Sequence, residues 1–133
     1  MIDGIAAGAV AAVLSGVPST LHALATRTSP LEATLAAGTL LAPHARRAPA
    51  LAAAAVPLHL ALSFGWAIAL AAVLPRRHTV AWATAAGLAI AALDLGVVGR
   101  RYPRIRALPL LPQVLDHVAY GATVGAVLRA RRT

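Results

Sequence analysis

The chain has 133 residues, of which 59% are hydrophobic and only 12% are charged. A water-soluble protein of this size needs far more polar surface, so the composition excludes an ordinary soluble domain and favours a single membrane domain over residues 1–133. The net charge of +8 comes from arginines that lie between apolar stretches and do not alternate with aromatic residues, so anionic lipids are expected as partners and nucleic acid is not.

Four apolar stretches each approach the roughly 20 residues that a spanning helix needs. We therefore predict an all-α integral membrane protein, with four transmembrane helices in a bundle. Its expected location is the cell membrane of a bacterium, because abundant alanine and arginine without lysine suggest a GC-rich bacterial genome. The first stretch follows an N-terminus without a basic region, so we expect it to be retained rather than removed as a signal peptide. The predicted spans are residues 4–24, 51–74, 80–98 and 108–128.

Residues 30–42 are predicted to form a short helix between the first two spans. Ser29, Pro30 and Glu32 form a helix start, with serine as the N-cap, proline at the first helical position and glutamate completing a capping box. The stretch that follows is too short to cross a membrane, and Pro43 ends it. We therefore expect an interfacial or re-entrant helix here.

Two kinds of residue predict how the spans bend and pack. Pro18 and Pro57 lie inside the first and second spans, where each removes a backbone hydrogen bond and tends to kink the helix. Small residues at intervals of four let helix backbones approach closely, either within one chain or between the copies of a homo-oligomer. These small residues are Gly4, Gly8, Ala12 and Gly16 in the first span and Gly121 and Gly125 in the fourth.

The arginines also predict the orientation in the membrane. We call the side that holds the N-terminus side A and the opposite side B. Five arginines fall on side A and seven on side B. By the positive-inside rule this difference favours side B in the cytoplasm, with residues 25–50 and 99–107 on that side. Because the difference is small, insertion in both orientations and an antiparallel dimer also stay open.

Five ionisable side chains fall inside the predicted spans, where they are costly and mark a functional site by default. At about 1.5 Å per residue, counted from the nearest arginine, all five lie roughly 8–18 Å from the side B boundary. Asp94 and Asp116 are each expected to face a histidine. We call the set the polar layer, and it predicts a buried site that opens towards side B. Its members are His22, His59, Asp94, Asp116 and His117, and Ser19, Ser63, Gln113 and Tyr120 share their helix faces.

The polar layer predicts binding or translocation of a small ligand, ion or proton, because aspartate and histidine pairs change charge near physiological pH. The alternative is a metal-dependent membrane enzyme acting on a lipid-borne substrate, in which the same five residues hold a divalent transition metal. Haem b is less favoured, because two carboxylates do not suit a mainly apolar haem pocket. A structural or assembly subunit of a membrane complex is the third option. Motifs of soluble enzymes are absent, so whether the chain is an enzyme stays open.

Four arginines lie close together in the loop of residues 99–107. Guanidinium groups bind phosphate in a bidentate manner, so a phospholipid or an isoprenyl phosphate is conceivable as a ligand or substrate. The simpler interpretation, which we favour, is that the loop anchors to anionic lipid headgroups. The four are Arg100, Arg101, Arg104 and Arg106.

Overall fold

The computed structural model describes all 133 residues, and these form helices and turns without a β-strand. Three helical segments are long and apolar enough to cross a membrane. The first consists of two successive helices, and the third continues beyond its α-helix as a π-helical and then a 3₁₀ turn. The segments are Ile2–Ala25, formed by α1 (Ile2–Leu14) and α2 (Val17–Ala25); Ala48–Val73, which is α4; and Thr79–Arg101, formed by α5 (Thr79–Leu93), η1 (Asp94–Val98) and η2 (Gly99–Arg101).

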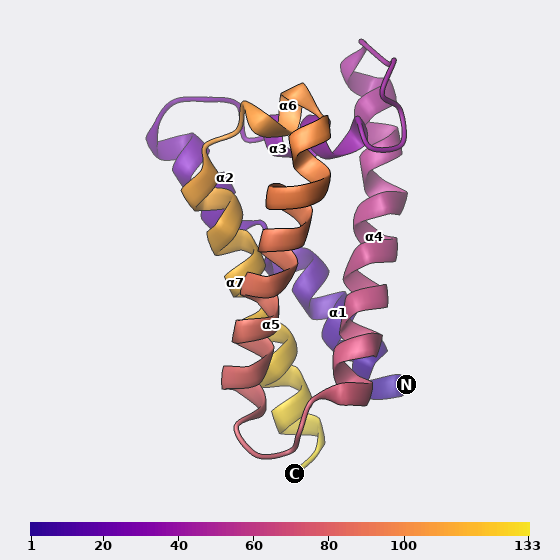
Figure 1. The fold of residues 1–133 in the computed structure, drawn as a ribbon, viewed down its shortest axis with the longest axis vertical. Coiled ribbons are helices and arrows are strands. Elements are labelled where there is room, and N and C mark those ends of the chain that lie inside the picture. The colour runs from indigo at the N-terminus through magenta and orange to yellow at the C-terminus, as the bar shows by residue number, and fades with distance from the viewer.

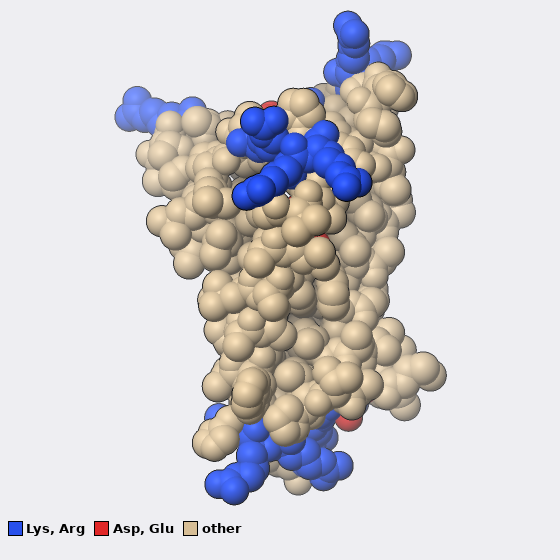
Figure 2. Space-filling view, in the orientation of Figure 1, with Lys and Arg blue, Asp and Glu red and all other residues tan.

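Arginines are confined to the two ends of the molecule. Figure 2 shows them gathered at the upper and lower ends, with a broad uncharged surface between. Large apolar side chains are exposed on the spanning segments, among them Leu21, Val56 and Leu88. Exposed apolar side chains between two charged ends are the arrangement that a lipid bilayer requires, which agrees with the predicted membrane class.

The long helices run alternately up and down, so both termini lie at the lower end of Figure 1. This lower end is side A, and the upper end, where two short helices lie, is side B. α1 packs against α4, and the last long helix packs against α5, α1 and α2. The last long helix is α7 (Leu110–Arg131), and the short helices are α3 (Glu32–Gly38) and α6 (Pro103–Arg106).

The prediction of four spans is confirmed for three of them. α7 has 22 residues, but it is not among the helices that are apolar enough to cross a membrane on composition alone. It is also the helix with the most buried residues, including Tyr120, Val124 and Leu128. A helix that is surrounded by protein can carry polar residues that would be costly against lipid, which explains its lower hydropathy.

Most small residues of the predicted packing motifs are used within one chain. A Cβ atom at Gly4 would come within 2.7 Å of the Cα of Ile68, so α1 and α4 touch through their backbones. A Cβ at Gly121 would overlap the carbonyl oxygen of Ala83, and one at Gly87 would overlap that of His117. α5 and α7 are therefore in direct backbone contact along their shared face.

The short helix between the first two spans is shorter than predicted. α3 begins at Glu32 and ends at Gly38, whereas residues 39–41 form turns and residue 42 has no regular structure. The predicted capping box does not form. Ser29 accepts a hydrogen bond from the amide of Leu31 at 3.2 Å, and the Glu32 carboxylate binds Arg104 instead of a backbone amide. A guanidinium is the stronger partner for a carboxylate, because both groups are charged and their geometries match.

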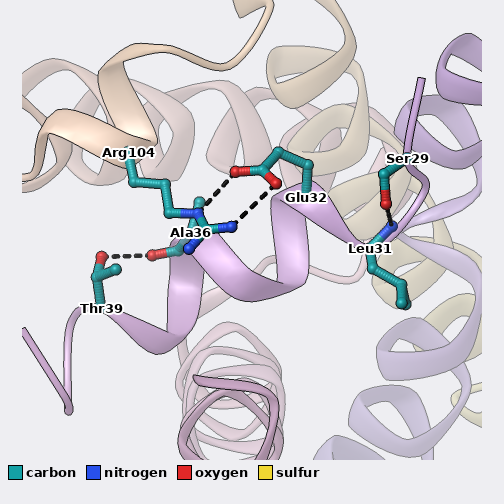
Figure 3. A network of polar contacts seen from close by, with 6 residues as sticks. All are labelled: Ser29, Leu31, Glu32, Ala36, Thr39 and Arg104. Carbon is teal, nitrogen blue, oxygen red and sulfur yellow. Dashed lines mark hydrogen bonds and ion pairs between the residues drawn. The ribbon is translucent and has the colours of Figure 1, made fainter. Parts of the chain in front are cut away.

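Arg104 joins α6 to the start of α3 on side B. Its Nε donates to Oε1 of Glu32 at 2.7 Å and its Nη2 donates to Oε2 at 3.1 Å (Figure 3). The hydrogen bond from Arg104 holds the pKa of Glu32 below its ordinary value of 4.5. The pair therefore joins α3 to α6 on side B, although the two helices are far apart in the sequence.

Replacing Glu32 by glutamine is expected to remove a pH-dependent part of the stability. Because the folded-state pKa of Glu32 is lowered, its contribution is fully present above the ordinary value of 4.5 and disappears as the pH falls through the folded-state value. Both side chains are partly exposed, so E32Q should lower the free energy of unfolding by only about 0.5 kcal/mol at neutral pH. Thermal unfolding in detergent at about pH 7 and about pH 2 measures this. An equal difference between E32Q and wild type at both pH values would contradict it.

Candidate functional site

The helix of the first spanning segment is interrupted close to residues of the polar layer. α1 ends at Leu14 and α2 begins at Val17, with a short turn between them. Pro18 has no N–H group to continue the helical hydrogen bonds, and its ring crowds the preceding turn. Because α1 ends and α2 begins here, the carbonyl of Ala12 in the last turn of α1 and the amide of Ser19 in the first turn of α2 have no backbone partner.

Side chains from two other helices bind these freed backbone groups. His59 of α4 donates from Nε2 to the carbonyl oxygen of Ala12 at 2.8 Å. Asp116 of α7 accepts the amide of Ser19 through Oδ1, also at 2.8 Å. Two members of the polar layer thus cap a broken helix and fasten it to α4 and α7.

The side chains of Asp94 and His117 are in contact between α5 and α7, at the junction of α5 with η1. Nε2 of His117 lies 3.3 Å from Oδ2 of Asp94, and its Nδ1 lies 2.8 Å from the backbone carbonyl of Gln113. The side chain of His117 is 21% exposed and that of Asp94 is 30% exposed. Asp94 is also the first residue of the π-helical turn, a wider turn that is frequent at functional sites.

The contacts of His117 determine where one proton lies. The carbonyl of Gln113 can only accept, so Nδ1 of His117 carries a hydrogen. Nε2 faces a carboxylate oxygen of Asp94, and this contact is a hydrogen bond only when a proton lies on Nε2 or on Oδ2. The pair therefore holds one exchangeable proton. Without that proton, the lone pair of an imidazole nitrogen would face a carboxylate.

Four residues share helix faces with the polar layer, and three of them, Ser19, Ser63 and Gln113, take part in its contacts through backbone groups. The hydroxyl of Tyr120 donates to the carbonyl oxygen of Ser63 at 2.5 Å, which joins α7 to α4 in the buried core. Ser63 and Gln113 each contribute a carbonyl oxygen, and Ser19 contributes its amide. Of the four residues, only Tyr120 makes its contact with another helix through its side chain.

His22 does not join the other members of the polar layer. Its side chain is exposed and makes no hydrogen bond, although Ser15 and Ser19 of the same segment are covered by protein. The break at Pro18 shifts the helical phase, so a face defined by regular spacing on one side of it does not continue on the other. His22 therefore points away from the site.

The predicted set of metal ligands does not form. No three histidine or acidic side chains come together in an arrangement that could hold a metal ion. Asp94 pairs with His117, whereas His59 and Asp116 bind backbone groups of the first segment. Donors that are arranged in pairs in this way suit hydrogen bonding and proton exchange rather than a metal centre.

The side B arginines do not act as one group. Arg104 is occupied by Glu32, whereas Arg101 and Arg106 are exposed. Arg100 lies at the edge of an apolar groove of about 380 Å³ between α5, η1 and the start of α7.

Comparison of the chain with protein-family models, with curated proteins and with solved structures gave no match.

Proposed function

We propose that the protein is a four-span membrane protein that takes up and releases a proton at the Asp94–His117 pair. The observation that supports this most directly is the proton that the two hydrogen bonds of His117 require between Nε2 and the carboxylate. Histidine is the side chain whose charge most readily changes near physiological pH, and aspartate and histidine chains mark proton pathways in membranes. Both side chains are partly exposed, so protein does not fully enclose the pair.

Gain and loss of the proton would act on the two irregular points of the spans. Asp94 begins the π-helical turn, and loss of the proton turns its attraction for His117 into repulsion. Asp116, the residue directly before His117 in α7, holds the amide of Ser19 at the break between α1 and α2. A change in the protonation of the pair would therefore alter the contacts of α5 and, through α7, those of the first segment. A proton relay or a proton-coupled transporter requires such coupling.

Proton flux into liposomes tests the proposal. Purified protein is reconstituted around a trapped pH-sensitive dye, and a pH gradient is imposed across the membrane. Wild type should dissipate the gradient faster than protein-free liposomes do. D94N and H117Q should lower the flux by at least about tenfold, because each removes one titratable member of the pair while keeping a side chain that can form hydrogen bonds.

His22 provides the matched control. It lies in the same polar layer by sequence, but its side chain is exposed and makes no hydrogen bond. H22Q should therefore conduct like wild type. The proposal fails if wild type conducts no better than protein-free liposomes, or if D94N conducts like wild type.

A structural role within a membrane complex is the second candidate function. It is supported by the fact that His59, Asp116 and Tyr120 all bind backbone groups, and so hold helices together. Under this alternative, D94N and H117Q would lower the unfolding temperature, and neither wild type nor variants would conduct protons.

A further inference from the structure

A basic cleft opens at the side A end of the molecule, away from the polar layer. It has a volume of about 640 Å³ and lies between the loop that joins α4 to α5, the first turn of α5 and the end of α7. Arg76 enters it from the loop, and Arg129 and Arg132 enter it from α7. These segments contribute to the group of arginines at the lower end of Figure 2.

No acidic side chain lines this cleft. The chain has only four acidic residues, and each is engaged elsewhere. The partners of these four are Arg131 for Asp3, Arg104 for Glu32, His117 for Asp94 and the Ser19 amide for Asp116.

The cleft is held in shape by contacts with backbone carbonyls. Arg132 donates from Nη1 to the carbonyl of Leu74 at 3.2 Å and from Nη2 to that of Ala71, which fixes the end of α7 against the end of α4. The hydroxyl of Thr79 lies 2.9 Å from the carbonyl oxygen of Pro75 and 3.0 Å from that of Arg76. The loop that carries the Arg76 side chain is thereby fastened to α5, so the arginines converge on a formed cavity.

We propose that this cleft binds a phosphate group through Arg76, Arg129 and Arg132. Guanidinium groups bind phosphate oxygens with paired, charge-assisted hydrogen bonds, and the first residues of α5, Thr79, Val80 and Ala81, line the same space. The volume is within the range of small-ligand sites and admits a phosphate ester as well as the free ion. The phosphate arrives either as the headgroup of an anionic lipid in the side A leaflet or as a soluble phosphate, because both present the same oxygens.

Two double variants separate the cleft from general attraction to anions. R76Q/R129Q removes two arginines that line the cleft. R77Q/R131Q removes the same charge from the same two segments, and Arg77 and Arg131 do not line the cleft, although R131Q also breaks the ion pair of Arg131 with Asp3. Because Arg76 and Arg129 are exposed and make no ion pair in the fold, R76Q/R129Q should fold. Thermal unfolding of each variant checks this, and R76K/R129K, which keeps the charge, provides a second comparison.

The full-length protein in detergent is tested with two probes. Native mass spectrometry measures how much phosphatidylglycerol is retained compared with phosphatidylcholine, and isothermal titration calorimetry measures binding of inorganic phosphate and glycerol phosphate. R76Q/R129Q should weaken binding by at least about tenfold, whereas R77Q/R131Q should change it by less than about twofold. Binding confined to phosphatidylglycerol identifies the lipid as the source, and binding of the soluble probes identifies free phosphate. Equal losses in both double variants, or no binding of any probe by wild type, would overturn the proposal.

Discussion

Replacing Gly121 by alanine is expected to destabilise the protein by about 2–3 kcal/mol. A Cβ at this position would overlap the carbonyl oxygen of Ala83 and lie 3.1 Å from the Cα of Gly87. Both are backbone atoms of α5, so no side-chain rotation can make room. α5 and α7 would have to move apart, which would also separate Asp94 from His117. Unfolding in detergent, followed by tryptophan fluorescence, measures the loss, and the proton flux should fall with it.

Gly65 provides the matched control for this prediction. It lies within α4, and a Cβ there would meet no atom within 4 Å. The same substitution, glycine to alanine in a helix, should therefore be neutral or stabilise by up to about 1 kcal/mol. The opposite signs of the two effects isolate close packing from helix propensity. If G121A and G65A behaved alike, contact between α5 and α7 would not limit the stability.

Replacing Asp116 by alanine is expected to lower the free energy of unfolding by about 1–3 kcal/mol, because the amide of Ser19 would lose its only partner. Asp116→Asn should restore most of this loss, since an amide oxygen can accept the same hydrogen bond without a charge. Equilibrium unfolding of both variants in detergent measures the difference. Were D116N as damaging as D116A, the charge of Asp116 would matter more than the hydrogen bond, which would contradict its role as a cap.

The helices could be predicted closely because a long apolar stretch is a property of consecutive residues. The second predicted span, 51–74, corresponds to α4 at Ala48–Val73, and the fourth, 108–128, corresponds to α7 at Leu110–Arg131. The short helix was predicted less well. Its start depends on where the Glu32 carboxylate binds, and Arg104, the residue that binds it, lies far along the chain.

The site could be predicted only in part. The sequence shows which side chains are polar, but it does not show which backbone amides and carbonyls are left without a helical partner. Asp94 and His117 were expected at one depth, and they lie 3.3 Å apart. Asp116 was expected to face a histidine, but it accepts a backbone amide that only the helix break makes free. Pro18 was the signal for that break. The sequence does not show which side chains bind the backbone groups that the break leaves free.

The sequence by itself determined which helix carries each polar residue and where along that helix it lies, because both follow from the order of residues and a nearly constant rise per residue. Only the tertiary structure decided which residues meet. That outcome depends on the rotation of each helix and on its distance from its neighbours, which are set by the glycine contacts between α5 and α7 and by the break at Pro18. The tertiary structure also decided that the side A arginines form a cleft, because the loop after α4 and the end of α7 meet only when the helices pack.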